Sequence, residues 1–207
     1  MIIAVDGPTA SGKGTIARAL AAHYGLPHLD TGLLYRAVGY RVATLGGDPD
    51  DPGDALVAAD FPDRLLDDPA LRSEATGALA SRVSVHPGLR AALLDRQRRF
   101  ARQPGGAVLD GRDIATVIAP DADARLFVTA SIAARALRRW AEMHARGEDV
   151  SREDIAADLA ARDARDTARS AAPLRQAEGA ALLDTSALPA EAAIAAAIAL
   201  VDKQLGR

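Results

Sequence analysis

Short apolar runs alternate with longer segments of helical periodicity along this chain of 207 residues. The segments expected to form strands cover residues 2–5, 28–32, 107–113, 124–130 and 180–184. Residues 28–32 are a short strand or strand end, residues 107–113 are a strand that ends in a loop, and the apolar parts are typical of buried strands. Helical spacing of apolar side chains extends over residues 15–24, 33–45, 71–85, 88–102, 131–145, 151–169 and 186–205. Strands that alternate with helices form parallel sheets covered on both faces, so the pattern predicts an α/β fold with a parallel five-stranded sheet flanked by helices.

Polar residues mark the ends of several predicted helices. Ser131 and Ser151 stand where a helix N-cap is expected, and Asp154, three residues after Ser151, completes the pattern of a capping box. His86-Pro87 separates two helices, because the residue before a proline disfavours the helical conformation. Residues 46–69 are rich in Asp, Pro and Gly without a sustained period, which predicts a loop with a single helical turn.

Composition narrows the classes of function. The chain has no cysteine, which excludes disulfides, thiolate metal sites and a cysteine nucleophile, and its four histidines show no metal-ligand spacing, so we expect them at surface or cap positions. A formal net charge of −3 argues against a chain-wide basic surface for nucleic acid. No apolar run has the length of a membrane span or a signal peptide, so we expect a cytoplasmic protein without a membrane partner. Only Lys13 and Lys203 among the 25 positive side chains are lysines.

A glycine-rich segment between the first strand and the first helix carries the sharpest chemical signal. Glycine lets the backbone curl until its N–H groups converge on phosphate oxygens, and the following helix N-terminus adds roughly half a positive charge. Lys13 would reach the terminal phosphates, and Thr15 offers the nearest hydroxyl for a magnesium ion because Gly14 stands where the usual pattern has Ser or Thr. A glycine-rich turn without a ligand is the alternative. The segment predicts a P-loop that binds ATP and Mg²⁺ through Gly7, Pro8, Thr9, Ala10, Ser11, Gly12, Lys13, Gly14 and Thr15.

Four further motifs, together with this loop, resemble one known family. They are LDTGLLYR (29–36), SRVSVHPGLR (81–90), LDGRDIATVIAPDA (109–122) and RDARDTARSAAPL (162–174). In this order and over nearly the whole chain they are similar to the bacterial cytidylate kinases, and GKGT in the loop looks like the nucleoside monophosphate kinases. The resemblance implies a P-loop kinase fold with a small monophosphate-binding lobe and a lid. It also implies transfer of a phosphoryl group from ATP to CMP or dCMP.

The segment after the second strand offers a hydroxyl, an aromatic ring and a guanidinium. Thr31 and Tyr35 are spaced i, i+4, so both can face one cleft, and Arg36 follows. The three groups suit a base edge, a nucleoside face and a phosphate. The resemblance assigns them, with Ser81 and Arg90, to binding of the monophosphate. The alternative is that Thr31 caps the helix, Tyr35 packs and Arg36 is solvated.

The third strand runs into Asp110, Gly111, Arg112 and Asp113. Ligands of an open parallel sheet bind at the carboxyl ends of its strands. Arg112 is suited to clamp a phosphate with two hydrogen bonds. Asp110 and Asp113 are suited to accept from a base amine, orient the arginine or hold a magnesium-bound water. The resemblance places Arg112 and Asp113 against the monophosphate, and we expect Asp110 with them. An Asp-Gly turn with incidental charges is the alternative.

Three arginines of a later helix are spaced i, i+3, i+7, which places Arg162, Arg165 and Arg169 on one helical face. Like charges at this spacing disfavour an isolated helix, and a polyphosphate between them would reverse the effect. The resemblance favours substrate contact for Asp166 and Arg169, and we expect Lys13, Arg112, Arg162 and Arg165 to act in catalysis by neutralising charge. Salt bridges along the helix are the alternative.

The motifs divide the expected single kinase domain into three parts. Residues 1–30, 91–138 and 171–207 form the core, residues 31–90 the monophosphate-binding lobe and residues 139–170 the lid. The acidic stretch 48–68 stands where many family members have a longer insert. We expect a monomer that binds CMP or dCMP and ATP, and no nucleic acid. A P-loop kinase for another nucleoside monophosphate or small metabolite, and a non-catalytic nucleotide-sensing module, are the other functions that fit.

Overall fold

The computed structural model describes all 207 residues and contains one five-stranded sheet. The strands follow the spatial order β2-β3-β1-β4-β5, and β1 pairs in parallel with both β3 and β4, so that Ile3 lies opposite Val108 and Ala124. The strand bounds are β1 (Ile2–Asp6), β2 (His28–Asp30), β3 (Ala107–Gly111), β4 (Ala124–Thr129) and β5 (Ala181–Asp184). The predicted α/β fold with a parallel five-stranded sheet is confirmed.

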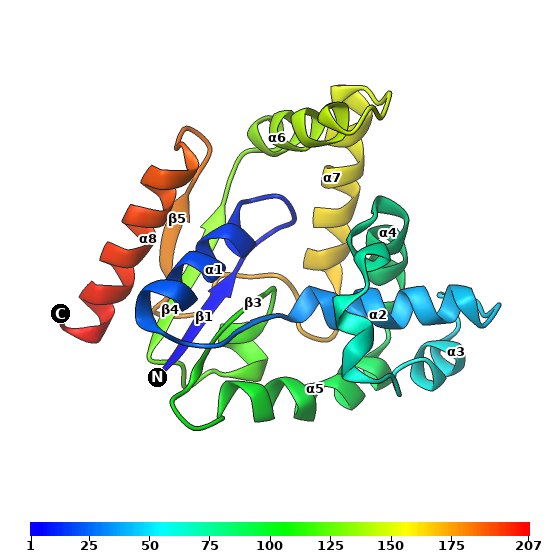
Figure 1. The fold of residues 1–207 in the computed structure, drawn as a ribbon, viewed down its shortest axis with the longest axis horizontal. Helices are drawn as coiled ribbons and strands as arrows, with labels where there is room; N and C mark the ends of the chain where they lie inside the picture. Colours follow the sequence, from blue (N-terminus) through cyan, green and yellow to red (C-terminus); the bar gives the residue numbers. More distant parts are fainter. The chain divides into compact units, whose positions relative to one another are not determined.

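Two helices cover one face of the sheet. Figure 1 shows α1 (Lys13–Tyr24) and α8 (Ala190–Leu205) along the strands, and both contribute to one apolar core with β1, β3, β4 and β5. Ile16 and Leu20 of α1 are buried against this core, as are Ala197 and Val201 of α8. Burial of a side chain the size of Leu20 stabilises the fold by about 2 kcal/mol. The strands thereby hold the loop between β1 and α1 in a fixed place.

A single π-helical turn follows β3 and was not predicted from the sequence. This turn, η3 (Ile114–Ile118), packs against β1 and β3. Asp6 at the end of β1 fixes its start, because the amides of Ile114 and Ala115 donate to the two carboxylate oxygens at 2.8 and 2.9 Å. The carboxyl ends of β1 and β3 are therefore locked together.

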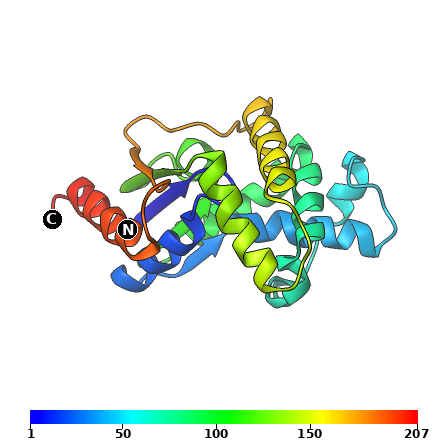
Figure 2. The same cartoon turned by 90° about the horizontal axis from the view of Figure 1, so that it is seen from above.

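The helices α6 (Ile132–Ala145) and α7 (Arg152–Ala168) form a packed pair, as Figure 2 shows together with the long loop that returns from α7 to β5. Met143, Ile155 and Leu159 are buried between them. Both predicted N-caps are confirmed, since Ser131 Oγ accepts from the Ala134 amide at 3.2 Å and Ser151 Oγ accepts from the Asp154 amide at 3.0 Å.

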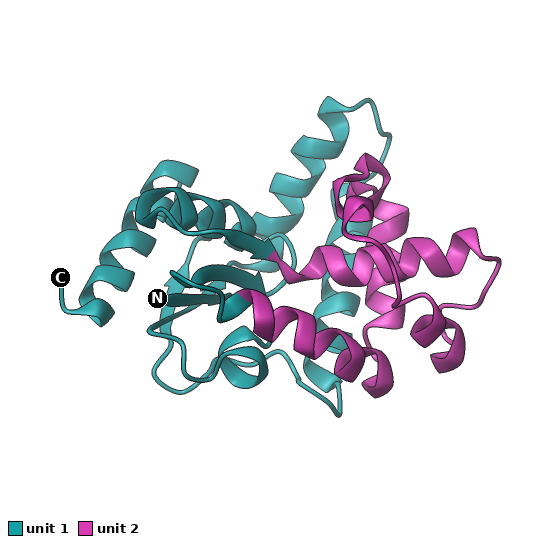
Figure 3. Ribbon diagram, turned by 60° about the horizontal axis from the view of Figure 1, so that its bottom comes forward, with its two compact units in different colours: residues 1–29, 101–207 teal, residues 30–100 magenta.

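The chain divides into two compact units, coloured in Figure 3. Residues 1–29 and 101–207 form the unit that contains most of the sheet, and residues 30–100 form a helical unit around Leu34, Leu71, Val83 and Leu89. The helical unit contains α2 (Thr31–Thr44), α3 (Pro52–Val57), η1 (Asp63–Asp67), η2 (Pro69–Arg72), α4 (Glu74–Val83) and most of α5 (Pro87–Ala101). The expected functional division into a lobe at 31–90 and a lid at 139–170 stays a prediction. None of the helices is long and apolar enough to cross a membrane.

The prediction for residues 46–69 was wrong in part, because this stretch holds α3 and the 3-10 turn η1. Asp51 caps α3 by accepting from the amides of Gly53 and Asp54 at 2.8 and 2.9 Å, and Pro52 occupies the first helical position. Ala55 and Phe61 are buried in the core of the helical unit. Two apolar anchors therefore order a stretch that has no helical period.

Candidate nucleotide-binding site

The predicted P-loop lies between β1 and α1 in a conformation that requires glycine at two positions. A Cβ atom on Gly7, whose φ is +155°, would lie 2.0 Å from the carbonyl oxygen of Val128 in β4. Gly12 adopts a left-handed conformation with φ of +88° at the N-cap of α1, and its carbonyl accepts from the amides of Thr15 and Ile16 at 3.1 Å each. The first turn of α1 thus begins directly after the loop, which gives the loop a helix N-terminus suited to an anion.

Side chains hold three carbonyl groups of the loop. The carbonyl of Pro8 accepts from Lys13 Nζ (3.3 Å), that of Thr9 from Arg135 Nη1 (3.2 Å) and that of Ser11 from Thr185 Oγ1 (2.9 Å). In a trans peptide the carbonyl and the following N–H point in opposite directions. Each of these bonds therefore fixes the plane of one loop peptide, with its N–H directed away from the side chain that holds the carbonyl.

A cavity of about 440 Å³ opens beside this loop. Gly12 and Lys13 line it together with Arg138 and Arg139 of α6 and with Leu188 before α8. The lining combines the P-loop backbone and several cations with Glu142 and apolar side chains, a mixture that suits a ligand with both charged and apolar parts. The P-loop and the clustered cations make this cavity the candidate site for a ligand that carries phosphates.

Oxygen donors for a magnesium ion lie at the base of the loop. Thr15 is exposed on the first turn of α1, and its hydroxyl accepts from Arg18 Nη2 at 3.5 Å. Oδ2 of Asp110 lies 3.7 Å from the place of a Cβ on Gly14, while Oδ1 of Asp110 pairs with His28 Nε2 at 2.7 Å. No group of three or more His, Asp or Glu side chains could hold a metal ion by itself. One carboxylate and one hydroxyl fit Mg²⁺, which keeps its waters and takes its other ligands from phosphates.

Arg112, Asp166 and Arg169 meet at the carboxyl end of β3. Asp166 is fully buried, and its two carboxylate oxygens accept from Arg112 Nε and from Arg169 Nη2. Burial by itself would raise the pKa of Asp166, but the guanidiniums of Arg112, Arg169 and Arg162 outweigh burial and lower that pKa below its ordinary value. Arg112 also donates through Nη2 to Thr9 Oγ1, so the cluster reaches the P-loop.

The predicted arginine face of α7 is only partly as expected. The helix ends at Ala168, and Arg169 is its C-cap. Arg169 therefore lies one residue beyond the helix in which it was expected. Arg162 acts on Asp166 electrostatically, whereas Arg165 is exposed. The structure brings Arg162 and Arg169 together around one carboxylate, in place of a straight row of three.

The predicted substrate residues of the helical unit lie on α2, α4 and α5. The guanidinium of Arg90 lies over the Tyr35 ring, 5.4 Å from its centroid. Arg36 Nη1 donates to the carbonyls of Leu71 and Ser73 at 2.7 and 2.9 Å, so the alternative of a solvated Arg36 is wrong.

Two buried hydroxyls complete this set. Thr31 and Ser81 are 3% and 2% exposed. Asp30, and not Thr31, caps α2, because its Oδ1 accepts from the Gly32 amide at 2.9 Å. The alternative role of Thr31 as the cap is therefore wrong.

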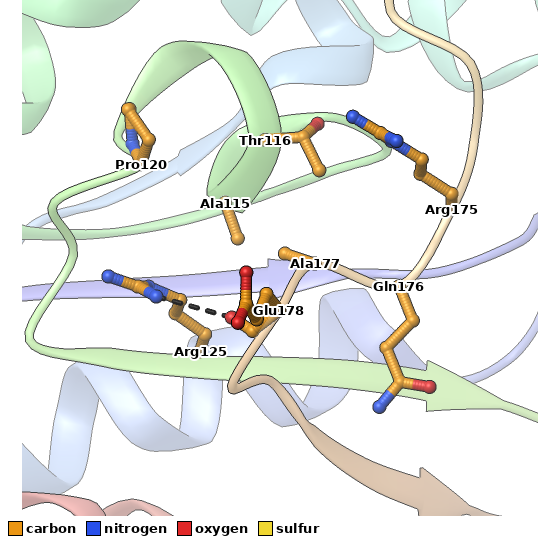
Figure 4. A pocket seen from close by; sticks show the side chains of 8 residues that line it. All are labelled: Ala115, Thr116, Pro120, Arg125, Arg175, Gln176, Ala177 and Glu178. Atoms are coloured by element: carbon orange, nitrogen blue, oxygen red, sulfur yellow. Dashed lines mark hydrogen bonds between the residues drawn. The ribbon is translucent and has the colours of Figure 1, made fainter.

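A larger cavity of about 630 Å³ contains none of the predicted site residues. Figure 4 shows it between the turn after β3, the start of β4 and the loop before β5, with Arg125 and Arg175 in its walls. Arg125 Nη1 donates to the Glu178 carbonyl at 3.2 Å, drawn as a dashed line, so this guanidinium helps to hold the loop in place. The smaller cavity, and not this one, combines the P-loop with clustered cations.

Two histidines expected at the surface or at caps have buried partners. His28 pairs with the buried Asp110, and in the helical unit His86 is buried with Nε2 2.9 Å from the Pro49 carbonyl oxygen.

The residues that hold the P-loop from a distance were not identified from the sequence. Thr185 directly follows β5, and the rule that sites form at the carboxyl ends of strands could have found it. Arg135 shows no comparable signal in the sequence.

A parallel sheet with a P-loop between its central strand and the next helix, and with arginines gathered around the loop, defines a P-loop nucleotide-binding protein. The sequence profile of a family described as cytidylate kinase matches residues 3–59 and 63–203. The chain is 59% identical to a cytidylate kinase of Xanthobacter autotrophicus over 100% of both chains. It is 54% identical to one of Caulobacter sp. (strain K31) over 100% of this chain and 96% of that protein. The chain belongs to the cytidylate kinase family.

A solved structure supports the fold independently. An uncharacterized protein from Eubacterium ventriosum ATCC 27560 matches 98% of this chain and 98% of its own, with a TM-score of 0.56 at 15% sequence identity. A likeness at this identity concerns the fold alone.

Proposed function

We propose that this protein transfers the γ-phosphoryl group of ATP to CMP and dCMP. Membership of the cytidylate kinase family gives the reaction. The observation that carries ATP binding is the P-loop cavity, in which Lys13 lies with Arg138 and Arg139 beside a loop whose carbonyls are held by side chains. A phosphate oxygen of the monophosphate forms the new bond to the γ-phosphorus as the bond to the β–γ bridging oxygen breaks, and ADP leaves.

Charge neutralisation and positioning supply the catalysis in this proposal. Lys13, Arg112, Arg162 and Arg165 neutralise the charge that spreads over the transferred group. Arg112 is well placed for this role because it touches Thr9 of the P-loop and Asp166 of α7 at once. A guanidinium held on two sides loses little further freedom when a phosphate arrives.

Magnesium would be held by Thr15, with Asp110 orienting its water ligands. When bound, the ion would supply positive charge that neutralises the phosphates of ATP. The chain's own contribution is to keep the Asp110 carboxylate beside Gly14, and His28 fixes that carboxylate through a contact of 2.7 Å.

The monophosphate contacts in this proposal are Thr31, Tyr35, Arg36, Ser81, Arg90, Asp110, Arg112, Asp113, Asp166 and Arg169. The Arg90 guanidinium lies over the face of the Tyr35 ring, and an aromatic ring beside a cation suits recognition of a nucleoside phosphate. Arg36 is already fixed by two carbonyl groups, so it offers a rigid cation. The cytoplasmic location and the monomeric state expected from the sequence stay predictions.

A coupled assay of ADP formation with CMP, dCMP, UMP and AMP tests the function. We expect the highest kcat/KM with CMP and dCMP. Arg36→Met should raise KM for CMP and leave KM for ATP unchanged, because Arg36 belongs to the monophosphate contacts alone. Equal rates with all four acceptors would contradict the cytidylate preference, and no transfer to any of them would contradict the kinase.

A further inference from the structure

Thr185 connects the P-loop to helix α6. It is 2% exposed and follows β5, and its Oγ1 lies 2.9 Å from the Ser11 carbonyl oxygen and 3.2 Å from that of Thr129. Arg138 of α6 donates from Nη1 to the same hydroxyl at 3.0 Å and from Nη2 to the Thr185 carbonyl. One hydroxyl thus touches both the loop and Arg138 of α6, which also lines the nucleotide cavity.

The arginine decides how the hydroxyl of Thr185 is used. A threonine hydroxyl has a single proton, and a guanidinium can only donate. Since Arg138 occupies an acceptor position of the hydroxyl, the proton goes to a carbonyl oxygen. The carbonyl of Ser11 is the nearer one, and that of Thr129 already accepts from the Thr185 amide at 2.8 Å.

A hydrogen bond to the carbonyl of Ser11 fixes the plane of the peptide that joins Ser11 to Gly12. The N–H of Gly12 belongs to this peptide and points away from Thr185 because the peptide is trans. Gly12 lines the nucleotide cavity with φ of +88°, and a glycine has other backbone conformations of similar energy available to it. Without the bond this peptide is free to rotate away from the orientation that a phosphate needs.

Helix α6 acts on the loop at two points. Arg135 and Arg138 are spaced i, i+3 and so lie on one face of the helix. Arg135 holds the carbonyl of Thr9 directly at 3.2 Å, and Arg138 reaches the carbonyl of Ser11 through Thr185. We propose that Thr185 is a positioning residue for the triphosphate of ATP, through which Arg138 sets the orientation of the Ser11–Gly12 peptide.

This inference rests on ATP binding, which is one part of the proposed function. Isothermal titration calorimetry of the full chain with ATP, and separately with inorganic triphosphate, tests it without any acceptor. We expect Thr185→Val to lower the affinity for ATP and for triphosphate about tenfold, because one oriented hydrogen bond is lost. Thr185→Ser, which keeps the hydroxyl, should stay within about twofold of wild type by the same reasoning. The affinity for CMP should be unchanged.

Thr76→Val is the matched control. Thr76 is 4% exposed and its hydroxyl donates to the Ala70 carbonyl at 2.9 Å, so the substitution removes the same kind of bond far from the loop in sequence. It should lower the unfolding temperature and leave ATP affinity unchanged. If Thr185→Val binds ATP like wild type, or if Thr185→Ser is as weak as Thr185→Val, the inference is wrong.

A double-variant cycle tests the role of Arg138. Arg138→Met should weaken ATP binding, and the combined Arg138→Met/Thr185→Val variant should be weaker by less than the product of the two separate effects, because both break one chain of bonds. A simple product would contradict the coupling. If Thr185→Val lacks the wild-type circular dichroism spectrum, Thr185→Cys replaces it, with a loss between those of Ser and Val. If the variants change ATP affinity as expected but the wild-type protein transfers no phosphoryl group to CMP, the proposed kinase function is wrong and this inference still holds.

Discussion

Arg135 of α6 and Asp163 of α7 form an ion pair with two hydrogen bonds, from Nη1 to Oδ1 at 3.1 Å and from Nη2 to Oδ2 at 2.5 Å. The Arg135 side chain is only 4% exposed and that of Asp163 is 25% exposed. The same guanidinium donates to the carbonyls of Thr9 and Ala130 at 3.2 and 2.9 Å. A single side chain therefore joins the P-loop, the end of β4 and both helices of the α6–α7 pair.

Removal of the partner carboxylate should be costly, because it leaves a buried cation with fewer acceptors. Asp163→Ala is expected to lower the free energy of unfolding by about 2–4 kcal/mol, measured by urea denaturation. Glu148→Gln breaks the exposed pair between Glu148 and Arg146 and should have little effect. If both variants lose the same small amount, the Arg135–Asp163 pair does not hold the helices together.

Asp6 should give the stability an unusual dependence on pH. Burial raises the pKa of Asp6 from 3.8 to about 7, although the amides of Ala115 and Ile114 lower it in part. Between these values the folded protein binds more protons at Asp6 than the unfolded chain does. The contribution of Asp6 is therefore fully present below pH 3.8 and is lost as the pH rises through about 7.

Urea denaturation at a series of pH values checks this sign. The free energy of unfolding of wild type minus that of Asp6→Asn should decrease as the pH rises from about 5 to 8. Asp121→Asn is the control, since hydrogen bonds from its own backbone amide and from Arg102 lower the pKa of Asp121. The difference for Asp121→Asn should stay constant over that range. An increase with pH for Asp6→Asn would contradict the raised pKa.

The sheet and the P-loop were predictable because their signals are local. A run of apolar residues such as 2–5, followed by glycines and then a helical period, determines strand, loop and helix without reference to the rest of the chain. Serine caps such as Ser151 are equally local, since they act three residues away. The helical turns within residues 46–69 could not be predicted from local signals, because they are ordered by Ala55 and Phe61, which pack in the core of the helical unit.

The contacts that shape the site depend on residues far apart in the sequence. Thr185 lies 174 residues from Ser11, and His28 lies 82 residues from Asp110. The sequence motifs named Asp110 and Ser11 as site residues, but the identity of their partners follows from strand order, which no local pattern gives. Residues that touch a ligand carry recognisable motifs, whereas residues that position them through one hydrogen bond do not.

Two helical glycines should respond in opposite directions to the same substitution. A Cβ on Gly39 of α2 would lie 2.8 Å from Leu79 Cβ and 2.9 Å from the Leu79 carbonyl carbon in α4, so Gly39→Ala must push the two helices apart. We expect a loss of about 1–3 kcal/mol. A Cβ on Gly88 of α5 would meet nothing within 4 Å, and Gly88→Ala should gain about 0.5–1 kcal/mol. Thermal unfolding measures the stability of both variants relative to wild type. A Gly39→Ala variant more stable than wild type would contradict the close approach of α2 and α4.

The two lysines of the chain provide a matched test of the P-loop. Lys13 lines the nucleotide cavity, whereas Lys203 is exposed near the end of α8. Lys13→Ala should lower kcat by at least about 100-fold, because in the proposed reaction it removes the positive charge that neutralises the transferred phosphate. The circular dichroism spectrum should stay that of wild type.

Lys203→Ala removes an equal charge from the surface and should leave kcat and both KM values unchanged. The coupled assay with ATP and CMP measures both variants at one ionic strength, since exposed charges are screened by salt. Equal activity of the two variants would show that net charge and not the position of Lys13 matters, which would contradict the assignment of the P-loop. Arginine at position 13 offers a further comparison: a planar fork replaces a slender point charge in a tight loop, so Lys13→Arg should recover little of the lost kcat.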